Sequence, residues 1–321
     1  MEKRKVTIIG GGVLGSQIAL ITAFHGYDVT IWLRSEGSIG RTQPKLDLYS
    51  EAMLRDLEAA KAMVGHPDPK TEYPRAMITD LNGLTVEKID ELKAQAKQRF
   101  AENLHFELDM ATAVKDAYIV IETMSENPQA KIGVYEQMRD LLNEDTILCT
   151  NTSTYLPSMF AEYTGKPEKY LSLHFANTIW KNNTAEVMRH AGTSDAAFNE
   201  VVTFAKSIGM IALKLNKEQP GYLLNSLLIP LLDAAQSLWA RGIADPIDID
   251  KAWIYGTGAP KGPFGIMDIV GFETVYNIVS MHPDAQKEGT VKNIVAKLFK
   301  EKIDKGETGI NSGIGFYDYR K

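Results

Sequence analysis

Residues 5–34 read KVTIIGGGVLGSQIALITAFHGYDVTIWLR, and this stretch decides the fold. It begins with β-branched residues, passes through three consecutive glycines and continues as an apolar segment, residues 16–25, that Gly26 ends. A second apolar run, residues 29–33, follows. The pattern predicts a strand, a glycine turn, a helix and a second strand within about thirty residues, which is the beginning of a doubly wound α/β fold.

The glycines of this turn have a spacing typical of nucleotide binding. Gly10, Gly12 and Gly15 fit Gly-x-Gly-x-x-Gly. In that pattern the first glycine permits a tight turn, the second lets a pyrophosphate approach the backbone, and the third packs the helix on the strand. Val13 and Leu14 lie between these glycines and are also expected to contact the cofactor, and the free amide groups and dipole at the start of the helix then face the phosphates. We therefore expect a dinucleotide site; the alternative is a plain tight turn.

The end of the second strand bears on which dinucleotide binds. An Asp or Glu in this place usually accepts hydrogen bonds from the ribose hydroxyls of NAD. Here Leu33 occupies the position, and Arg34 and Ser35 follow. A guanidinium and a hydroxyl bind phosphate, whereas a carboxylate repels it. The sequence thus favours NADP; the alternative is NAD with Arg34 stacked on the adenine.

Composition limits the class of protein. The chain has 321 residues, of which 44% are hydrophobic and 24% charged, as in a soluble globular protein with room for two domains. The net charge of −6 disfavours nucleic acid as the main partner. The single cysteine, Cys149, rules out an internal disulfide and is expected to be buried and inert. With no signal peptide or membrane span expected before the first strand, we predict a cytoplasmic protein that binds no membrane.

Beyond the second strand the chain continues as an α/β domain with an insertion. Residues 37–44 are polar and glycine-bearing, which predicts a loop. Two charged helical patterns follow, at 45–64 and 85–103, so we expect a helical hairpin inserted at about 45–103. Alternation then resumes, with strands predicted at 105–108, 118–123, 146–150 and 170–175 and helices at 110–116 and 131–142. This order predicts a parallel sheet covered by helices on both faces, with ligands at the carboxyl ends of its strands.

The character of the chain changes near residues 216–220. Residues 221–240 form one long apolar helical pattern with Pro230 inside it. A second helix is expected from 245 to 255, then a glycine and proline loop at 256–265 and further helices to about 302. We therefore divide the chain into a dinucleotide-binding domain, 1–216, and an all-helical domain, 217–321. A helical domain this apolar is expected to bury surface in a second copy, giving a homodimer.

Four polar residues are candidates for chemistry, and no metal site is expected. His174 ends a predicted strand, where its imidazole can take a hydroxyl proton near neutral pH. Glu186 follows twelve residues later, which allows the chain to return and pair carboxylate with imidazole. Ser153 comes just after a strand, either to bond a substrate oxygen or to cap a helix. Asn225 lies among leucines of the long apolar helix and needs a polar partner there.

With these residues in place, the chain resembles the 3-hydroxyacyl-CoA dehydrogenase family, which includes 3-hydroxybutyryl-CoA dehydrogenase. The resemblance covers nearly the whole chain. It is carried by SEN at 125–127, NTS at 151–153, LHFAN at 173–177, QPGYLLN at 219–225, GAPKGPFGIMDIVG at 258–271 and SGIGFYDY at 312–319. It implies a Rossmann domain with an inserted helical hairpin, followed by a helical dimerisation domain.

The resemblance also implies roles for particular residues. His174 is implied as the catalytic acid and base, Glu186 as its partner, and Ser153 and Asn225 as substrate-binding groups. The residues implied near the nicotinamide half of the cofactor are Glu126, Lys131, Ser153 and Asn177. The implied reaction interconverts (S)-3-hydroxyacyl-CoA and 3-oxoacyl-CoA with NAD or NADP, as in fatty acid metabolism. Basic residues of the hairpin are candidates for the CoA phosphates, namely Lys45, Arg55, Lys61, Lys88 and Lys93.

Departures from the family pattern keep two alternatives open. The family usually continues after the histidine as Phe-Phe-Asn-Pro, whereas here Asn177 is followed by Thr178 and a polar loop, IWKNNT, that carries Trp180. This loop favours a dehydrogenase of a free 3-hydroxy acid, resembling the gulonate or carnitine dehydrogenases. The other alternative is a dinucleotide-binding structural protein, which would bind cofactor without turnover.

Overall fold

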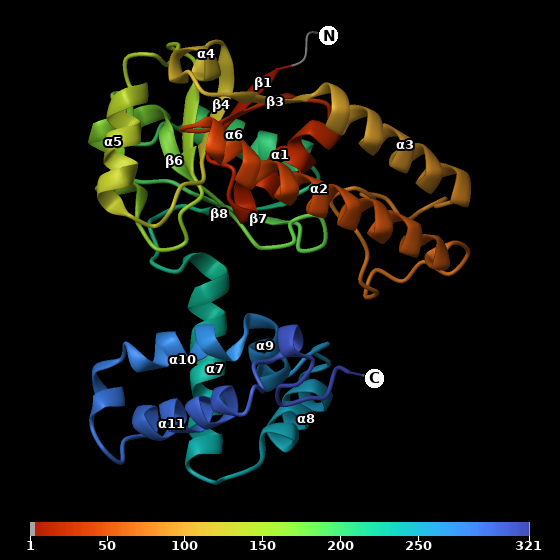
Figure 1. Ribbon diagram of the computed structural model, residues 1–321, viewed down its shortest axis with the longest axis vertical. Helices are drawn as coiled ribbons and strands as arrows, with labels where there is room; N and C mark the ends of the chain where they lie inside the picture. Colours follow the sequence, from red (N-terminus) through yellow and green to blue (C-terminus); the bar gives the residue numbers. More distant parts are fainter. Residues whose placement is uncertain (1–3, 321) are drawn as a thin grey trace. The chain divides into compact units, whose positions relative to one another are not determined.

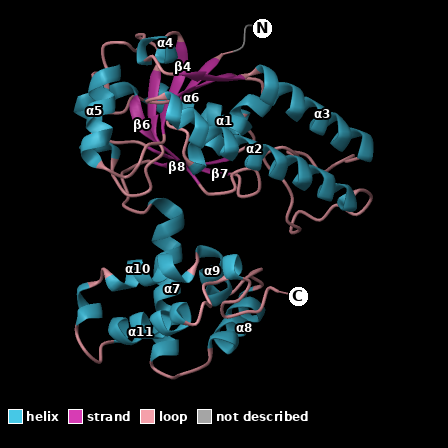
Figure 2. Cartoon of the chain, viewed as in Figure 1, coloured by secondary structure: helices cyan, strands magenta, loops and turns pink. Residues whose placement is uncertain are grey.

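The computed structural model describes residues 4–320, which divide into two compact units, one up to Leu223 and one from Leu224 onward. Figure 2 shows that the strands all lie in the first unit and that the second is built of helices and loops. The boundary expected after residue 216 falls in the segment between the last strand of the first unit and the long helix that follows it.

The first unit is organised by one eight-stranded sheet with the order β3-β2-β1-β4-β5-β6-β7-β8. Its strands are β1 (Lys5–Ile9), β2 (Asp28–Trp32), β3 (Leu104–Glu107), β4 (Ala117–Glu122), β5 (Ile147–Thr150), β6 (Tyr170–Phe175), β7 (Thr184–Met188) and β8 (Ile211–Leu215). Neighbouring strands are parallel except β6 and β7, which are antiparallel. The predicted strand, turn, helix and strand at the start of the chain are confirmed, as is the parallel sheet up to β6.

Helices cover both faces of this sheet (Figure 1). They are α1 (Val13–Phe24), α2 (Glu36–Ala59), α3 (Val86–Glu102), α4 (Met110–Val114), α5 (Pro128–Met138) and α6 (Asp195–Ser207). Two separate apolar clusters lie between sheet and helices. Every residue of α1 from Gly15 to Phe24 is buried, which explains why this helix is apolar all round. Sequence reasoning did not predict β7, α6 or β8.

The prediction of a loop at residues 37–44 is wrong, because α2 begins at Glu36 and includes these residues. Its glycines and Pro44 suggested a break, but buried contacts of Thr42 and Leu46 hold the segment helical. Pro44 still removes one helical hydrogen bond.

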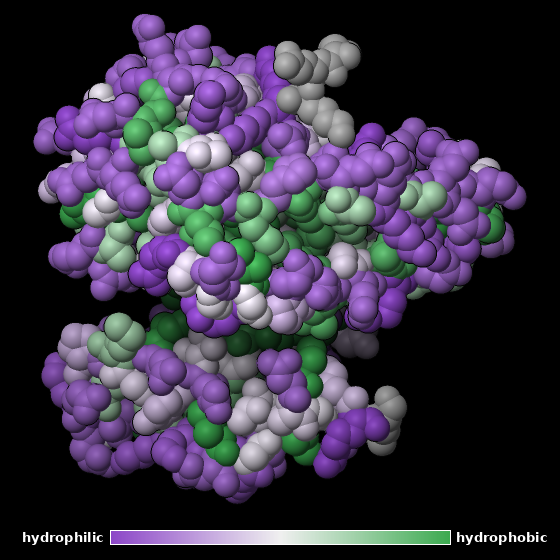
Figure 3. Space-filling view, turned by 45° about the horizontal axis from the view of Figure 1, so that its top comes forward, coloured by the Kyte–Doolittle hydropathy of each residue, from purple (hydrophilic) through white to green (hydrophobic). Residues whose placement is uncertain are grey.

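The helical insertion is confirmed as a hairpin of α2 and α3, which pack on each other and extend away from the sheet (Figure 1). A short 3₁₀ turn, Ala60–Met63, and an irregular segment connect the two helices. The hydroxyl of Thr85 accepts a hydrogen bond from Lys88 N at 3.2 Å and so caps α3. The outer surface of the hairpin is mostly hydrophilic (Figure 3).

The second unit contains most of α7 (Tyr222–Ala240), then α8 (Pro246–Thr257), α9 (Pro263–Val270), α10 (Phe272–Ser280) and α11 (Val291–Asp304). Its core is aromatic, with Phe264, Phe272 and Phe299 fully buried. The loop expected at 256–265 is shorter than predicted, because α9 begins at Pro263. The buried carboxylate of Asp250 holds this beginning by accepting hydrogen bonds from Phe264 N at 2.8 Å and Gly265 N at 2.9 Å.

Candidate active site

Two glycines of the turn between β1 and α1 are needed by the fold itself, whereas a third has open space beside it. Gly10 has a φ of +107°, which L side chains rarely adopt. A Cβ on Gly15 would lie 2.2 Å from the Gly10 carbonyl oxygen. A Cβ on Gly12 would meet nothing within 4 Å. The turn therefore presents open backbone at Gly12, beside the start of α1, as a bound pyrophosphate requires.

Helix α2 reaches this turn from the other side. A Cβ on Gly11 would lie 2.2 Å from Thr42 Oγ1, so only glycine fits between turn and helix. The Thr42 hydroxyl donates to the Gly11 carbonyl at 3.2 Å. Sequence reasoning missed this contact because it placed Thr42 in a loop. The third consecutive glycine was the one signal that something approaches closely there.

A hollow beside the glycine turn carries positive charge. It is lined by Gly10, Gly11, Gly12, Trp32, Leu33, Arg34, Ser38, Arg41, Thr42, Lys45, Thr123, Met124 and Ser125. No carboxylate is among these lining residues. Arg34 is exposed where Leu33 is buried, and Arg41 Nη2 donates to Ser38 Oγ at 2.9 Å. Ser38, Arg41 and Lys45 were not singled out for this hollow, although their spacing places them on one face of a helix.

The predicted pair of His174 and Glu186 is formed by two adjacent strands. The two residues lie directly opposite each other where β6 and β7 run antiparallel. His174 Nδ1 lies 3.0 Å from Glu186 Oε2, and both side chains are buried. A carboxylate accepts the Nδ1 proton, so the neutral imidazole presents Nε2 as a proton acceptor. The other carboxylate oxygen, Oε1, accepts a hydrogen bond from Leu223 N at 2.8 Å.

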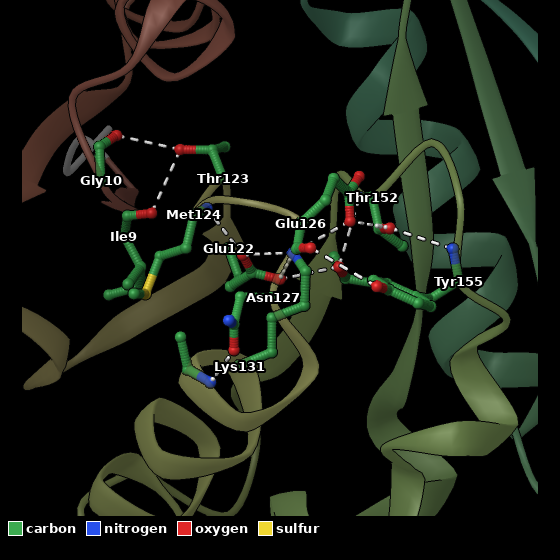
Figure 4. A network of polar contacts seen from close by, with 12 residues as sticks. Ile9, Gly10, Glu122, Thr123, Met124, Glu126, Asn127, Lys131, Thr152 and Tyr155 are labelled. Atoms are coloured by element: carbon green, nitrogen blue, oxygen red, sulfur yellow. Dashed lines mark hydrogen bonds and ion pairs between the residues drawn. The ribbon is translucent and has the colours of Figure 1, made fainter. Parts of the chain in front are cut away.

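Ser153 lies in the loop after β5, the strand next to β6. Its side chain is exposed, and its backbone N donates to Glu126 Oε1 at 2.8 Å. The Thr152 hydroxyl donates to Glu126 Oε2 at 2.6 Å, so both oxygens of this carboxylate hold the loop (Figure 4). Asn151 Oδ1 accepts a hydrogen bond from Phe175 N at 3.1 Å and connects the loop to the end of β6. Ser153 and His174 therefore occupy the same carboxyl edge of the sheet.

Beneath Glu126 lies a buried ion pair that the sequence did not reveal. Lys131 Nζ is 2.9 Å from Glu122 Oε1 and 3.8 Å from Glu126 Oε2, and Glu122 and Lys131 are fully buried (Figure 4). The hydroxyls of Tyr135 and Thr150 donate to Glu122 Oε2 at 2.7 and 2.8 Å. Burial raises the pKa of Tyr135, which keeps that hydroxyl a donor. The one signal was a lone carboxylate at the end of an apolar strand.

The loop after His174 turns its aromatic residue toward the hairpin. Trp180 is buried and its Nε1 donates to Asp56 Oδ2 at 2.7 Å. Lys181 Nζ pairs with the other oxygen of Asp56 at 2.9 Å. Asn177 is exposed just beyond β6, and its carbonyl accepts from Asn182 Nδ2 at 2.8 Å. The polar residues of this loop therefore fasten the hairpin, while Asn177 stays at the sheet edge.

The remaining candidates are described separately. Asn225 lies in the part of α7 that belongs to the second unit, so its predicted role beside His174 stays a prediction. Cys149 is buried, and burial raises the pKa of its thiol, so it remains protonated. Among residues 4–320, no group of three or more His, Cys, Asp or Glu side chains is arranged to hold a metal ion.

An open glycine turn on a doubly wound sheet and a carboxylate-paired histidine at the same edge define a nicotinamide-dependent oxidoreductase. Comparison with known families is consistent with this class. Residues 5–219 match the model of the 3-hydroxyacyl-CoA dehydrogenase NAD-binding domain, and residues 221–319 match that of the C-terminal domain. The chain belongs to the 3-hydroxyacyl-CoA dehydrogenase family.

Individual relatives agree along nearly the whole chain. A Caenorhabditis elegans protein named "Probable 3-hydroxyacyl-CoA dehydrogenase" is 30% identical over 99% of this chain and 96% of its own length. A 3-hydroxybutyryl-CoA dehydrogenase of Clostridioides difficile is 28% identical over 99% of this chain and all of its own. A solved structure described as a diketoreductase that acts on dicarbonyl compounds is 41% identical, with a TM-score of 0.79, and covers 99% of this chain and all of its own.

Proposed function

We propose that the protein interconverts a 3-hydroxy and a 3-oxo group, with (S)-3-hydroxyacyl-CoA as the first substrate class. The observation that carries the proposal is the contact of 3.0 Å between His174 Nδ1 and Glu186 Oε2 at the carboxyl edge of the sheet. This edge also carries the glycine turn, and ligands of doubly wound sheets bind there. The family supports the acyl-CoA substrate.

The residues of the site have complementary tasks. The nicotinamide, when bound, supplies the hydride acceptor or donor. In oxidation, His174 Nε2 takes the proton of the substrate hydroxyl, and Glu186 stabilises the imidazolium through Nδ1. In reduction, the same nitrogen returns the proton to the substrate oxygen. The Ser153 hydroxyl, which donates to Glu126 Oε1 at 3.3 Å, would turn from this carboxylate to donate to that oxygen, and Glu126 fixes the Ser153 loop through the backbone N of Ser153. We propose Asn225 as a further substrate-binding amide, and Lys131 and Asn177 as groups on the nicotinamide side.

The hairpin favours a second candidate substrate, a free 3-hydroxy or dicarbonyl acid. Lys61 is paired with Glu58 at 3.1 Å and with Asp90 at 2.7 Å. Lys93 is paired with Glu58, and Lys88 with Glu91. Lys45 lines the nucleotide hollow, so Arg55 alone of the five candidates is left for a CoA phosphate. The resemblance to a diketoreductase favours the same candidate.

The substrate classes are separated by absorbance at 340 nm. We expect reduction of acetoacetyl-CoA with a kcat/KM at least about tenfold above that for free acetoacetate, because CoA adds binding energy away from the reacting carbon. The reverse order would favour the free acid. Cofactor binding without turnover of either compound would overturn both candidates and favour a structural protein.

For the cofactor we propose NADP over NAD. The hollow beside the glycine turn places Arg34, Arg41 and Lys45 together without a carboxylate, which suits a 2′-phosphate. Arg34→Leu should raise KM for NADPH about tenfold or more and change KM for NADH little, whereas Arg55→Leu should change neither. An equal rise for both cofactors would instead indicate that Arg34 stacks on the adenine.

We further propose a cytoplasmic homodimer formed through the second unit. Large apolar side chains are exposed on it, including Leu227 at 74%, Tyr255 at 84% and Met281 at 84%. Within the described residues, α7 is the one helix long and apolar enough to cross a membrane by length and composition, and 17% of its apolar window is buried. Burial against a second copy would cover the same apolar surface.

A further inference from the structure

The segment that begins α7 contacts His174, Glu186 and the loop that carries Ser153. Tyr222 is the first residue of this helix, it is 1% exposed, and it belongs to the first unit together with Leu223. Its φ of +55° is a left-handed conformation that is uncommon for a bulky side chain. Such a conformation is retained only where surrounding contacts determine it.

The ring of Tyr222 lies against the imidazole. The ring centroids of Tyr222 and His174 are 4.5 Å apart, with an angle of 21° between their planes. Nδ1 of the same imidazole is held by Glu186. The stacked ring therefore fixes the second rotational coordinate of His174, since a hydrogen bond at one nitrogen leaves the plane of the ring free to turn.

The hydroxyl of Tyr222 holds the serine loop. It donates to the Thr152 carbonyl oxygen at 2.6 Å, one residue before Ser153. Burial raises the pKa of Tyr222, which keeps this hydroxyl protonated and able to donate near neutral pH. The next residue, Leu223, donates its backbone N to Glu186 Oε1 at 2.8 Å. Two consecutive residues thus touch the imidazole, its carboxylate and the loop of the substrate-binding serine.

We propose that Tyr222 is a positioning residue that aligns His174 and Ser153 for proton transfer, through its ring and its hydroxyl respectively. The proposal rests on the proposed function, because it takes His174 and Ser153 as the groups that meet substrate. It adds a residue that acts through both of them without touching the reacting atoms.

The hydroxyl is tested with Tyr222→Phe, which keeps the ring. We expect kcat for acetoacetyl-CoA reduction to fall about fivefold, the effect of one lost neutral hydrogen bond, with the Kd for the nicotinamide cofactor unchanged. Tyr27→Phe is the matched control, because Tyr27 OH is hydrogen-bonded to Ser207 Oγ at 2.6 Å and Tyr27 directly precedes β2, at the amino edge of the sheet rather than the carboxyl edge. It should leave kcat unchanged.

A double-mutant cycle separates positioning from general loss of structure. If Tyr222 acts through Ser153, adding Tyr222→Phe to Ser153→Ala should lower kcat by less than about twofold. A full fivefold fall in the Ser153→Ala background would overturn the assignment of the hydroxyl. So would an unchanged kcat in the single variant.

The ring is tested by the pH dependence of kcat/KM. Tyr222→Leu should shift the histidine-dependent limb of this profile to lower pH, because the ring face that stabilises the imidazolium is lost from one side of His174. Tyr222→Phe should leave that limb in place. If the histidine-dependent limb of kcat/KM lay at the same pH in wild type, Tyr222→Leu and Tyr222→Phe, the proposed role of the ring would be overturned. Full turnover in His174→Ala would overturn the proposed function itself. The Tyr222 variants test only the role of Tyr222, so the two failures can be distinguished.

Discussion

His174 is the residue whose removal has the most specific expected result. His174→Ala should lower kcat by roughly 10²- to 10⁴-fold, because the imidazole is the group that takes and returns the proton in the proposed reaction. Cofactor binding, followed by tryptophan fluorescence, should be unchanged, since the glycine turn lies on another strand. His105→Ala is the control, because His105 is an exposed histidine paired with Asp28. Comparable losses in the two variants would contradict the assignment.

A second histidine sets an acid limit to stability. Burial lowers the pKa of His25 from 6.5 to about 4, and its Nε2 lies 2.8 Å from the Ala76 carbonyl. The folded protein keeps His25 neutral, while the unfolded chain binds a proton below pH 6.5. Its contribution is therefore fully present above pH 6.5 and is lost as the pH falls toward 4, by up to about 3 kcal/mol.

The expected loss of stability at acid pH is measured by urea unfolding at pH 7.5 and pH 4.5. The free energy of unfolding should fall less for His25→Gln than for the wild type, because glutamine has no proton to bind. His105→Gln should follow the wild type, since His105 is exposed. Parallel falls in wild type and His25→Gln would show that another group controls the acid limit.

At this scale the sequence predicted side chains better than their partners. The pairing of His174 with Glu186 could be predicted, because a strand end and a short return constrain both residues. The contacts of Tyr222 and the burial of Glu122 could not, because each depends on a segment distant in the chain. Arg41 was missed for a local reason, since glycines and a proline nearby suggested a loop.

Among the elements, α2 contains a testable defect. Pro44 lies in its ninth position, where proline removes a hydrogen bond. Pro44→Ala should raise the free energy of unfolding by about 1 to 2 kcal/mol, measured by urea denaturation, because the helical hydrogen bond is restored. Pro246→Ala is the control, because Pro246 begins α8, where proline is favoured and no gain is expected. An equal gain in both variants, or none in either, would contradict this account.

Elements with a strong internal period were predictable, and elements decided by tertiary contacts were not. The helices of the hairpin and of the second unit follow their apolar patterns. The start of α2 and the strand β7 depend instead on what they pack against. The antiparallel return of β7 could be anticipated only from the expected pairing of Glu186 with His174, and not from strand propensity.

At the scale of the whole molecule, the proposed dimer gives a direct measurement. The protein should have twice the chain mass of 35.6 kDa by light scattering after gel filtration. Leu227→Glu should yield monomer, because a charge would enter the apolar contact. Leu48→Glu is the control, since Leu48 is 55% exposed on the hairpin of the first unit. A monomeric wild type, or a dimeric Leu227→Glu, would contradict the proposed interface.

His174 and Glu186 are directly paired residues of the antiparallel strands β6 and β7. Turnover therefore depends on the correct register between these two strands. A slip of β7 by one residue would send the carboxylate to the opposite side while preserving most backbone pairing. The far-ultraviolet circular dichroism spectrum of such a misfolded species would hardly differ from that of the native protein, whereas an enzyme assay would show it to be inactive. Specific activity after refolding therefore measures the fraction of molecules in which β6 and β7 pair in the native register.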